Sequence, residues 1–246
     1  MATTASYQAT IEGFEAAGLD RAAALAAIET SVAVARRARD RYADETGVPA
    51  ADLLVAGSVG PYGAMLADGS EYRGDYDPGP MALRALHAPR IEALLEAGVD
   101  LLAFETIPTI REARVLLDLL AECGASAWLS FQCRDDATTA AGEPVADAFA
   151  MAADAKGLVA VGVNCGPPRH MATLLAAASR STHRPTIAYP NGGDIWDAVT
   201  RRWMASDGGG FDPKAVATWT TLGATWLGGC CGTRPTDIAD LARVLA

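Results

Sequence analysis

The 246-residue sequence contains only three histidines: His87, His170 and His183. None of them follows an apolar run of the kind that forms a strand, where catalytic or metal-binding side chains of α/β proteins are usually found. A Ser/His/Asp hydrolase and a histidine-ligated metal site are therefore both disfavoured.

The sequence also lacks a long apolar run and a basic leader. No apolar run approaches the roughly 20 residues of a membrane span. The first residues, MATTASYQAT, do not show a basic region followed by an apolar one. The net charge of −10, from 30 acidic and 20 basic residues, disfavours nucleic acid and anionic membranes as partners. We therefore predict a cytoplasmic protein that binds neither, and its oligomeric state stays open.

Half of the residues are hydrophobic, and many fall into short apolar runs separated by longer amphipathic segments. The runs typical of buried strands are 53–58, 100–105, 127–132, 158–164, 185–190 and 224–229, with "ATTAS" near the N-terminus as a further one. Helical patterns lie near 20–46, 80–97, 109–122, 144–156, 168–180, 212–222 and 235–245.

This alternation predicts parallel strands joined by right-handed crossovers. With the chain length, it favours a single α/β domain over residues 1–246, a (β/α)8 TIM barrel. An open doubly wound sheet is the alternative, although no GxGxxG motif follows the first strand. Only about seven strands can be counted where a closed barrel has eight, so we expect an N-terminally truncated barrel.

Polar residues follow the predicted strands at their carboxyl ends, which in a barrel form the catalytic rim. They are Ser58, Glu105, Gln132, Asn164, Cys165, Asn191, Cys230 and Cys231. Glu105 follows four apolar residues, and its carboxylate has two equally good interpretations. It is either satisfied by neighbouring backbone or binds the ammonium group of a substrate.

The five cysteines are an odd number in a long chain, which makes a disulfide framework unexpected. Cys165, Cys230 and Cys231 lie at strand ends, and three thiolates suit Zn²⁺ with its fourth position open for catalysis. The glycines around "GGCCG" let the chain leave strand geometry there. By itself, "GGCCG" is also compatible with a phosphate-binding loop or a vicinal disulfide. Cys123 and Cys133 are expected to be small core residues.

At these residues the sequence resembles the homocysteine S-methyltransferase family of zinc- and thiol-dependent methyltransferases. The matching stretches are "TTASYQAT" (3–10), "AGSVGPYGAMLADGSEYRGDY" (56–76), "FETIPTIREA" (104–113), "GVNCGPP" (162–168), "YPNGGDIWD" (189–197) and "GGCCGTRPTDI" (228–238). Together they cover nearly the whole chain in order. The segment 57–76 looks most like the branch that uses S-methylmethionine.

The resemblance implies a (β/α)8 barrel that makes methionine, with zinc held by Cys165, Cys230 and Cys231. It implies that Glu105 holds the amino group of homocysteine. It also implies a pocket with further residues: Ser58, Asn164 and Asn191. Zinc would keep the homocysteine sulfur as a thiolate, which attacks the methyl group of a sulfonium donor without a general acid.

Alternatives to this function remain open. One is an inactive or regulatory barrel that binds zinc or senses redox state through its thiols, and another is a methyltransferase that uses betaine or methylfolate. Members of the family begin with an additional β/α unit, for which this sequence has no counterpart. The 246-residue form is therefore expected to be a truncated or degenerate copy, poorly stable and weakly active.

Overall fold

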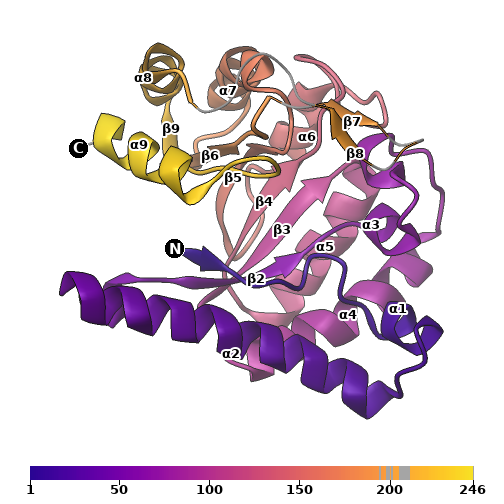
Figure 1. The fold of residues 1–246 in the computed structure, drawn as a ribbon. Helices are drawn as coiled ribbons and strands as arrows, with labels where there is room; N and C mark the ends of the chain where they lie inside the picture. Colours follow the sequence, from indigo (N-terminus) through magenta and orange to yellow (C-terminus); the bar gives the residue numbers. More distant parts are fainter. Residues whose placement is uncertain (194, 198–199, 201, 205–210, 246) are drawn as a thin grey trace.

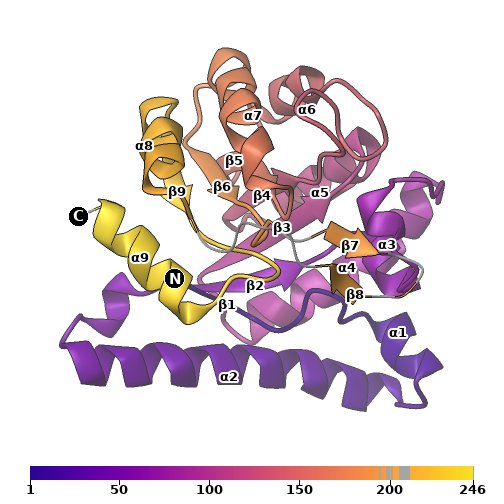
Figure 2. The ribbon, with the colours of Figure 1, turned by 45° about the horizontal axis from the view of Figure 1, so that its top comes forward.

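The main sheet has seven parallel strands, and Figures 1 and 2 show them curling with helices along the outer side. The computed structural model describes residues 1–193, 195–197, 200, 202–204 and 211–245. In spatial order the strands are β1 (Ala2–Thr3), β2 (Val55–Val59), β3 (Leu101–Ile107), β4 (Ala127–Phe131), β5 (Leu158–Asn164), β6 (Thr186–Tyr189) and β9 (Ala224–Leu227).

The helices follow the strands along the chain, as the sequence predicted. They are α1 (Ile11–Ala16), α2 (Arg21–Thr46), α3 (Tyr62–Leu66), α4 (Pro80–Glu96), α5 (Ile110–Cys123), α6 (Val145–Ala152), α7 (Pro168–Ser181), α8 (Pro213–Thr221) and α9 (Pro235–Leu245). Two 3₁₀ turns, η1 (Ala50–Asp52) and η2 (Ser70–Tyr72), and a small antiparallel hairpin of β7 (Ile195–Asp197) and β8 (Arg202–Met204) complete the described elements.

The strand order distinguishes between the two predicted architectures. Strands of the main sheet are neighbours in space in the same order as in the chain. A doubly wound sheet instead reverses its order at a switch point. The observed sheet therefore has the arrangement of a (β/α)8 barrel with one strand fewer. In the described residues, β1 pairs only with β2 and β9 pairs only with β6, and β1 lies near α9 in both views (Figures 1 and 2).

The two faces of the sheet have separate cores because side chains alternate along each strand. On β3, Leu102 and Phe104 pack in the large core between the strands and the helices. Leu101 and Ala103 belong to a smaller cluster on the inner face. Glu105 continues the inner series, so the alternation directs its side chain toward the hollow of the curled sheet.

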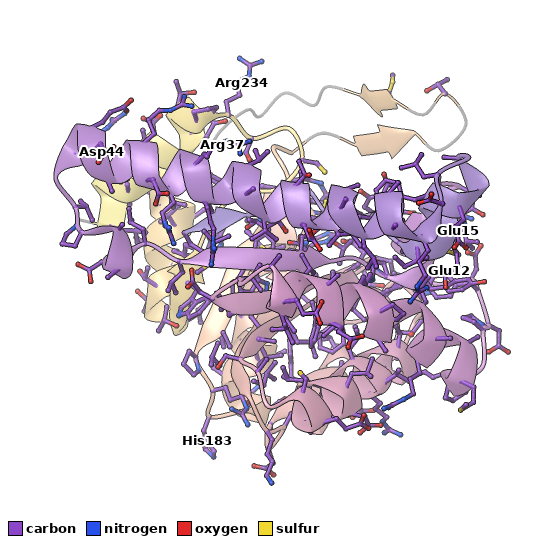
Figure 3. All side chains as sticks on the ribbon, turned by 90° about the horizontal axis from the view of Figure 1, so that it is seen from below. Glu12, Glu15, Arg37, Asp44, His183 and Arg234 are labelled. Carbon is purple, nitrogen blue, oxygen red and sulfur yellow. The ribbon has the colours of Figure 1, made fainter. Side chains whose placement is uncertain are left out.

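Helix α2 begins and packs as its sequence predicts. The Asp20 carboxylate accepts a hydrogen bond from the Ala23 N–H at 2.8 Å, which caps the first turn. Ile28 and Val32 are fully buried against the sheet. On the opposite side the helix exposes charged residues such as Arg37 and Asp44, which are labelled in Figure 3.

The long segment after β2 is more regular than the sequence indicated. We expected residues 57–80 to be irregular, and they contain the short helix α3 and the 3₁₀ turn η2. Five-residue and three-residue elements are too short to show a hydrophobic period, so sequence patterns miss them. The same holds for the six residues of α1 and for the strands β7 and β8.

A buried charge network joins α4 and α5 to this segment. The His87 Nε2–H donates to Glu112 at 2.7 Å, and His87 Nδ1 accepts from Arg90 at 2.7 Å. Burial, and then the charge of Arg90, lower the pKa of His87 to about 4, so its ring is neutral near pH 7. The Tyr62 N–H at 2.6 Å and the Tyr76 hydroxyl at 2.5 Å complete the shell of Glu112.

The network holds the start and the end of the segment after β2. Tyr62 lies near the start of this segment, as the first residue of α3, and Tyr76 lies near the end of the segment. The Arg90 guanidinium also donates to the Gly60 carbonyl. The residues between them, among them η2, are thereby fixed against the carboxyl ends of the strands.

Candidate metal and substrate site

The three cysteines at strand ends form a cluster. Cys165 directly follows β5, and Cys230 and Cys231 follow β9. Their sulfur atoms all lie within 4.8 Å of one another, and the Sγ atoms of Cys165 and Cys231 are 3.5 Å apart. In a tetrahedral zinc site with Zn–S bonds near ~2.3 Å, sulfur atoms are separated by ~3.8 Å. The spacing and the soft donor set therefore fit a thiolate-bound metal ion.

In the sheet, β6 lies between β5 and β9. The end of β6 and the residues after it, Tyr189 to Gly192, contact both Cys165 and the pair Cys230 and Cys231. The Cys165 N–H donates to the Tyr189 carbonyl at 3.0 Å, and the Cys230 N–H donates to the Pro190 carbonyl at 2.9 Å. Because both bonds continue the ladders of the sheet, the strands themselves determine how close the thiols come.

Glycine is needed where this linking chain passes the second cysteine segment. The Gly192 N–H donates to the Cys231 carbonyl at 2.7 Å. A Cβ atom at Gly192 would lie 2.8 Å from the Gly232 carbonyl oxygen, so a larger residue would push the segments apart. Gly232 itself has a φ of 76°, in the left-handed region that glycine adopts at little cost.

The thiols do not share their protons equally. Hydrogen bonds donated by Cys165 and Cys230 lower the pKa of Cys231 to about 3. Hydrogen bonding to Cys165 and Cys231, together with burial, raises the pKa of Cys230 well above its usual value. These opposite shifts of the pKa favour Cys231 as the thiol that loses its proton first. A bound metal ion would replace the two remaining thiol protons.

Asn164, which precedes Cys165, bonds to a residue with an unusual backbone conformation, Thr106. Its Oδ1 accepts from the Thr106 N–H at 2.8 Å, and its Nδ2 donates to the Thr106 hydroxyl at 2.8 Å. Thr106 and Cys165 both have a positive φ, of 61° and 53°, which is strained for residues with a Cβ. The same Nδ2 lies 4.0 Å from the Cys230 sulfur. The Asn164 amide thus braces strained residues beside the thiols.

Asn191 braces the same cysteine from the β6 side. Its Nδ2 donates to the Cys165 carbonyl at 3.1 Å, its N–H donates to the Gly166 carbonyl at 3.0 Å, and its Oδ1 accepts from the Gly193 N–H at 2.9 Å. The residue is 4% exposed. Asn191 therefore contacts the backbone around the cluster rather than the sulfur atoms. Asp194, from the same sequence motif, lies outside the described residues.

Glu105 and Ser58 meet on the inner face of the sheet. The Ser58 hydroxyl donates to Glu105 Oε1, and the Tyr189 hydroxyl donates to Glu105 Oε2 at 3.1 Å. Trp128 in turn donates to Tyr189 at 2.9 Å. Burial raises the pKa of Glu105, although the bonds from Ser58 and Tyr189 oppose that shift. The partners of this carboxylate are side chains of β2 and β6, and not the neighbouring backbone that was one of the two interpretations of the sequence. Its binding of an ammonium group stays a prediction.

Several residues at the site were not singled out by the sequence. The Tyr72 hydroxyl lies 3.8 Å from the Cys165 sulfur, and the Tyr7 hydroxyl is buried. Both belong to stretches that carry the family resemblance, which is the only signal that could have found them. Gln132, at the end of β4, donates to the neighbouring Cys133 carbonyl at 3.4 Å.

The two remaining cysteines differ from each other. Cys133 is buried, as expected for a small core residue. The same expectation is wrong for Cys123, which is exposed at the end of α5 and contacts the Leu120 carbonyl at 3.4 Å. Its place in the last turn, on the outer side of an amphipathic helix, accounts for the exposure.

Fold and site together define a parallel α/β protein of barrel type with a three-thiol metal-binding cluster at the carboxyl ends of its strands. The family model described as homocysteine S-methyltransferase matches residues 1–245. The homocysteine S-methyltransferase of Escherichia coli (strain K12) is 46% identical over an alignment of 246 positions that covers 98% of this chain and 78% of that protein. The chain belongs to the homocysteine S-methyltransferase family of enzymes.

Solved structures agree with this assignment. The metallated form of the homocysteine methyltransferase MmuM from Escherichia coli matches with a TM-score of 0.86 and 45% identity, over 98% of this chain and 78% of that one. The apo form of the same enzyme matches with a TM-score of 0.75 and 38% identity, over 92% and 76%. In the part of the chain that is described, we find no helix with the length and apolarity to span a membrane.

Proposed function

We propose that the protein transfers a methyl group from S-methylmethionine, or another sulfonium such as S-adenosylmethionine, to homocysteine bound on zinc, and so contributes to methionine biosynthesis. The observation that carries the proposal is the cluster of three thiols together with the partly buried carboxylate of Glu105. The cluster supplies three ligands and leaves room for a fourth. The carboxylate of Glu105 suits the ammonium group of the amino acid that brings this fourth sulfur.

Cys165, Cys230 and Cys231 would hold the zinc ion. The choice of zinc rests on the all-sulfur donor set and on the spacing of the three sulfur atoms. When bound, zinc lowers the pKa of a coordinated thiol, so that homocysteine binds as its reactive thiolate. The strained backbone of Cys165, braced by Asn164 and Asn191, keeps this ligand in place before the metal arrives.

Glu105 would bind and orient homocysteine. Ser58 and Tyr189 each donate to a different oxygen of its carboxylate, which fixes the plane of the group. Because burial already raises the pKa of Glu105, a nearby ammonium ion gains from the pairing and keeps the carboxylate ionised. The sulfur of homocysteine is thereby set in one direction for attack on the methyl group.

The donor needs no proton from the protein. A sulfonium loses its methyl group and leaves as a neutral thioether, so the reaction requires positioning more than acid catalysis. Among the described residues, none of the side chains found at the thiols or at Glu105 is a histidine. The preference for S-methylmethionine rests on the family resemblance of residues 57–76.

The test is a direct assay of methionine formation. Zinc-loaded protein receives homocysteine and one of four donors at equal concentration: S-methylmethionine, S-adenosylmethionine, betaine or methylfolate. We expect S-methylmethionine to give the highest rate. A clear preference for betaine would overturn the donor assignment. Zinc binding without methionine from any donor would favour a regulatory or inactive zinc-binding barrel. The expectation of weak activity and low stability stays a prediction, which the same assay and thermal melting address.

A further inference from the structure

A second carboxylate lies buried beside the thiols, and nothing in the reaction so far uses it. Glu71, in the 3₁₀ turn η2, is only 7% exposed. Its Oε2 atom is buried and has no hydrogen-bond partner among the described residues. A buried carboxylate that lacks a partner on one oxygen is costly, and in proteins such groups usually bind water, an ion or a ligand.

The surroundings of Glu71 place it at the reaction site. The negative charge of Cys231 is one of the influences that raise its pKa, after burial and the charge of Asp68. Burial raises the pKa of Tyr7 well above its usual value, and the negative charges of Cys165, Glu71 and Glu105 add to this shift. The next residue, Tyr72, places its hydroxyl 3.8 Å from the Cys165 sulfur. The turn η2 therefore lies over the thiol cluster.

Arg73, the cation whose charge acts on Glu71, does not form an ion pair with it. The Arg73 guanidinium lowers the pKa of Glu71 only in part. Its Nε atom instead donates to the Asp75 carboxylate at 2.7 Å, at the exposed surface. Among the described side chains, Glu71 therefore forms no ion pair, and Cys231 is one of the negative groups that raise its pKa.

We infer that Glu71 binds the positively charged sulfonium centre of the methyl donor. This inference rests on the proposed function, in which two cationic groups come close to the thiols. The ammonium group of homocysteine is assigned to Glu105. The sulfonium must also lie here, because its methyl carbon has to come within about 3–3.5 Å of the homocysteine sulfur. Glu71 is the remaining buried carboxylate that the described residues leave incompletely paired beside the cluster.

The role is one of binding and positioning, and the atoms balance without a proton from Glu71. The homocysteine sulfur gives an electron pair to the methyl carbon and forms the new S–C bond. The old S–C bond breaks, and its electron pair stays on the donor sulfur, which departs as a neutral thioether. The positive charge beside Glu71 disappears in this step, so the carboxylate holds the charged donor and not the neutral product.

The experiment separates donor binding from turnover. Trimethylsulfonium, which has the charge of the donor and no amino acid part, is titrated calorimetrically into zinc-loaded protein. We expect binding to the unsubstituted protein and at least 10-fold weaker binding to Glu71→Gln, which keeps the shape of the side chain. Asp75→Asn removes a negative charge from an exposed position of the same segment and serves as the matched control with unchanged affinity. Equal affinity in Glu71→Gln and the unsubstituted protein overturns the inference.

Kinetics supply the second measurement. In Glu71→Gln the KM for S-methylmethionine should rise at least 10-fold, while the KM for homocysteine and the zinc content stay unchanged. Glu71→Asp should recover part of the donor affinity, which a merely structural role would not predict. An equal rise in both KM values contradicts the assignment. If the unsubstituted protein binds trimethylsulfonium in a Glu71-dependent way but makes no methionine, the proposed function fails and the cation site stands.

Discussion

Two polar clusters contact the segment between β2 and α4, and they differ in how their side chains are bonded. In the network of Arg90, His87 and Glu112, a cation, a neutral ring and an anion follow one another with bonds of 2.7 Å between them. In the thiol cluster, three sulfur atoms gather within 4.8 Å, and hydrogen bonds from Cys165 and Cys230 lower the pKa of Cys231. In the first cluster the charged groups bond to one another, and Arg90 Nε alone among its side-chain atoms has no hydrogen-bond partner within the described residues. The second cluster has the spacing and the donor atoms of a metal-ligand shell.

The backbone is regular at the charge network and strained at the thiol cluster. The charge network stands on the regular helices α4 and α5, where side chains three residues apart share a face. The thiol site contains the two positive φ angles at Thr106 and Cys165, each costing on the order of 1–3 kcal/mol. Backbone strain of this kind is typical of functional sites. The strained residues therefore distinguish the thiol cluster from the charge network, which has a supporting role.

The largest change is expected from removing one thiol. Cys231→Ser should abolish stoichiometric zinc binding, because two cysteines and a hydroxyl are a poor ligand set for a soft site. Methyl transfer should fall by at least about 100-fold, since loss of outer partners of a metal ligand alone costs about 10–100-fold. Metal analysis and the methionine assay measure both. Cys123→Ser, at an exposed cysteine, is the control, and full zinc content in Cys231→Ser would remove this residue from the ligand set.

Breaking the charge network should act on stability and leave the metal in place. Glu112→Ala leaves Arg90 and His87 buried without their anion, which costs about 3–5 kcal/mol of unfolding free energy. Denaturant unfolding measures the loss, and zinc content is expected to stay at one per chain in the folded protein. Glu122→Ala, at an exposed ion pair of the same helix, should leave stability almost unchanged. A Glu112→Ala protein as stable as the unsubstituted one would contradict our account of the network.

Glu105→Gln should weaken homocysteine binding and leave zinc bound. The amide keeps the shape of the side chain but removes the charge that pairs with the ammonium group. Truncating one partner of such a buried pair costs about 2–5 kcal/mol. Homocysteine titration of the zinc-loaded variant measures the effect, with Glu71→Gln as the variant that is expected to keep its homocysteine affinity. Unchanged binding in Glu105→Gln would rule out the assignment.

A pH dependence sharpens the comparison further. The pKa of His87 is about 4 in the folded protein and about 6.5 in an unfolded chain. Between these values only the unfolded chain binds the proton, and this binding stabilises the unfolded state. The free energy of unfolding is therefore highest above pH 6.5 and decreases as the pH falls to 4. The shift corresponds to roughly 3 kcal/mol. Unfolding free energies of the unsubstituted protein and His87→Gln should diverge over this range, and parallel curves would contradict the neutral buried ring.

The sequence predicted the repeated units of the fold because each strand and long helix carries its own hydrophobic pattern. The runs around Leu101 and Leu158 became β3 and β5, and the Asp20 cap began α2 where expected. Parallel strands share one carboxyl edge, so strand ends also pointed to the side chains that meet there, among them Cys165 and Glu105.

What the sequence could not predict depends on contacts between distant segments. The positive φ of Thr106 is stabilised by Asn164, which lies 58 positions away. The turn that places Glu71 over the thiols is held by the buried network around Glu112, and no local pattern records that link. Cys123 was misplaced because one residue at the end of a helix can lie on either side of its buried face.

The central claim is that the thiol cluster is a ligand shell with one position for the sulfur of homocysteine. X-ray absorption at the zinc edge counts the sulfur ligands directly. Our account predicts three sulfur ligands and one lighter atom in the zinc-loaded protein, and four sulfur ligands after homocysteine is added. A sulfur count that does not change when homocysteine binds would contradict it.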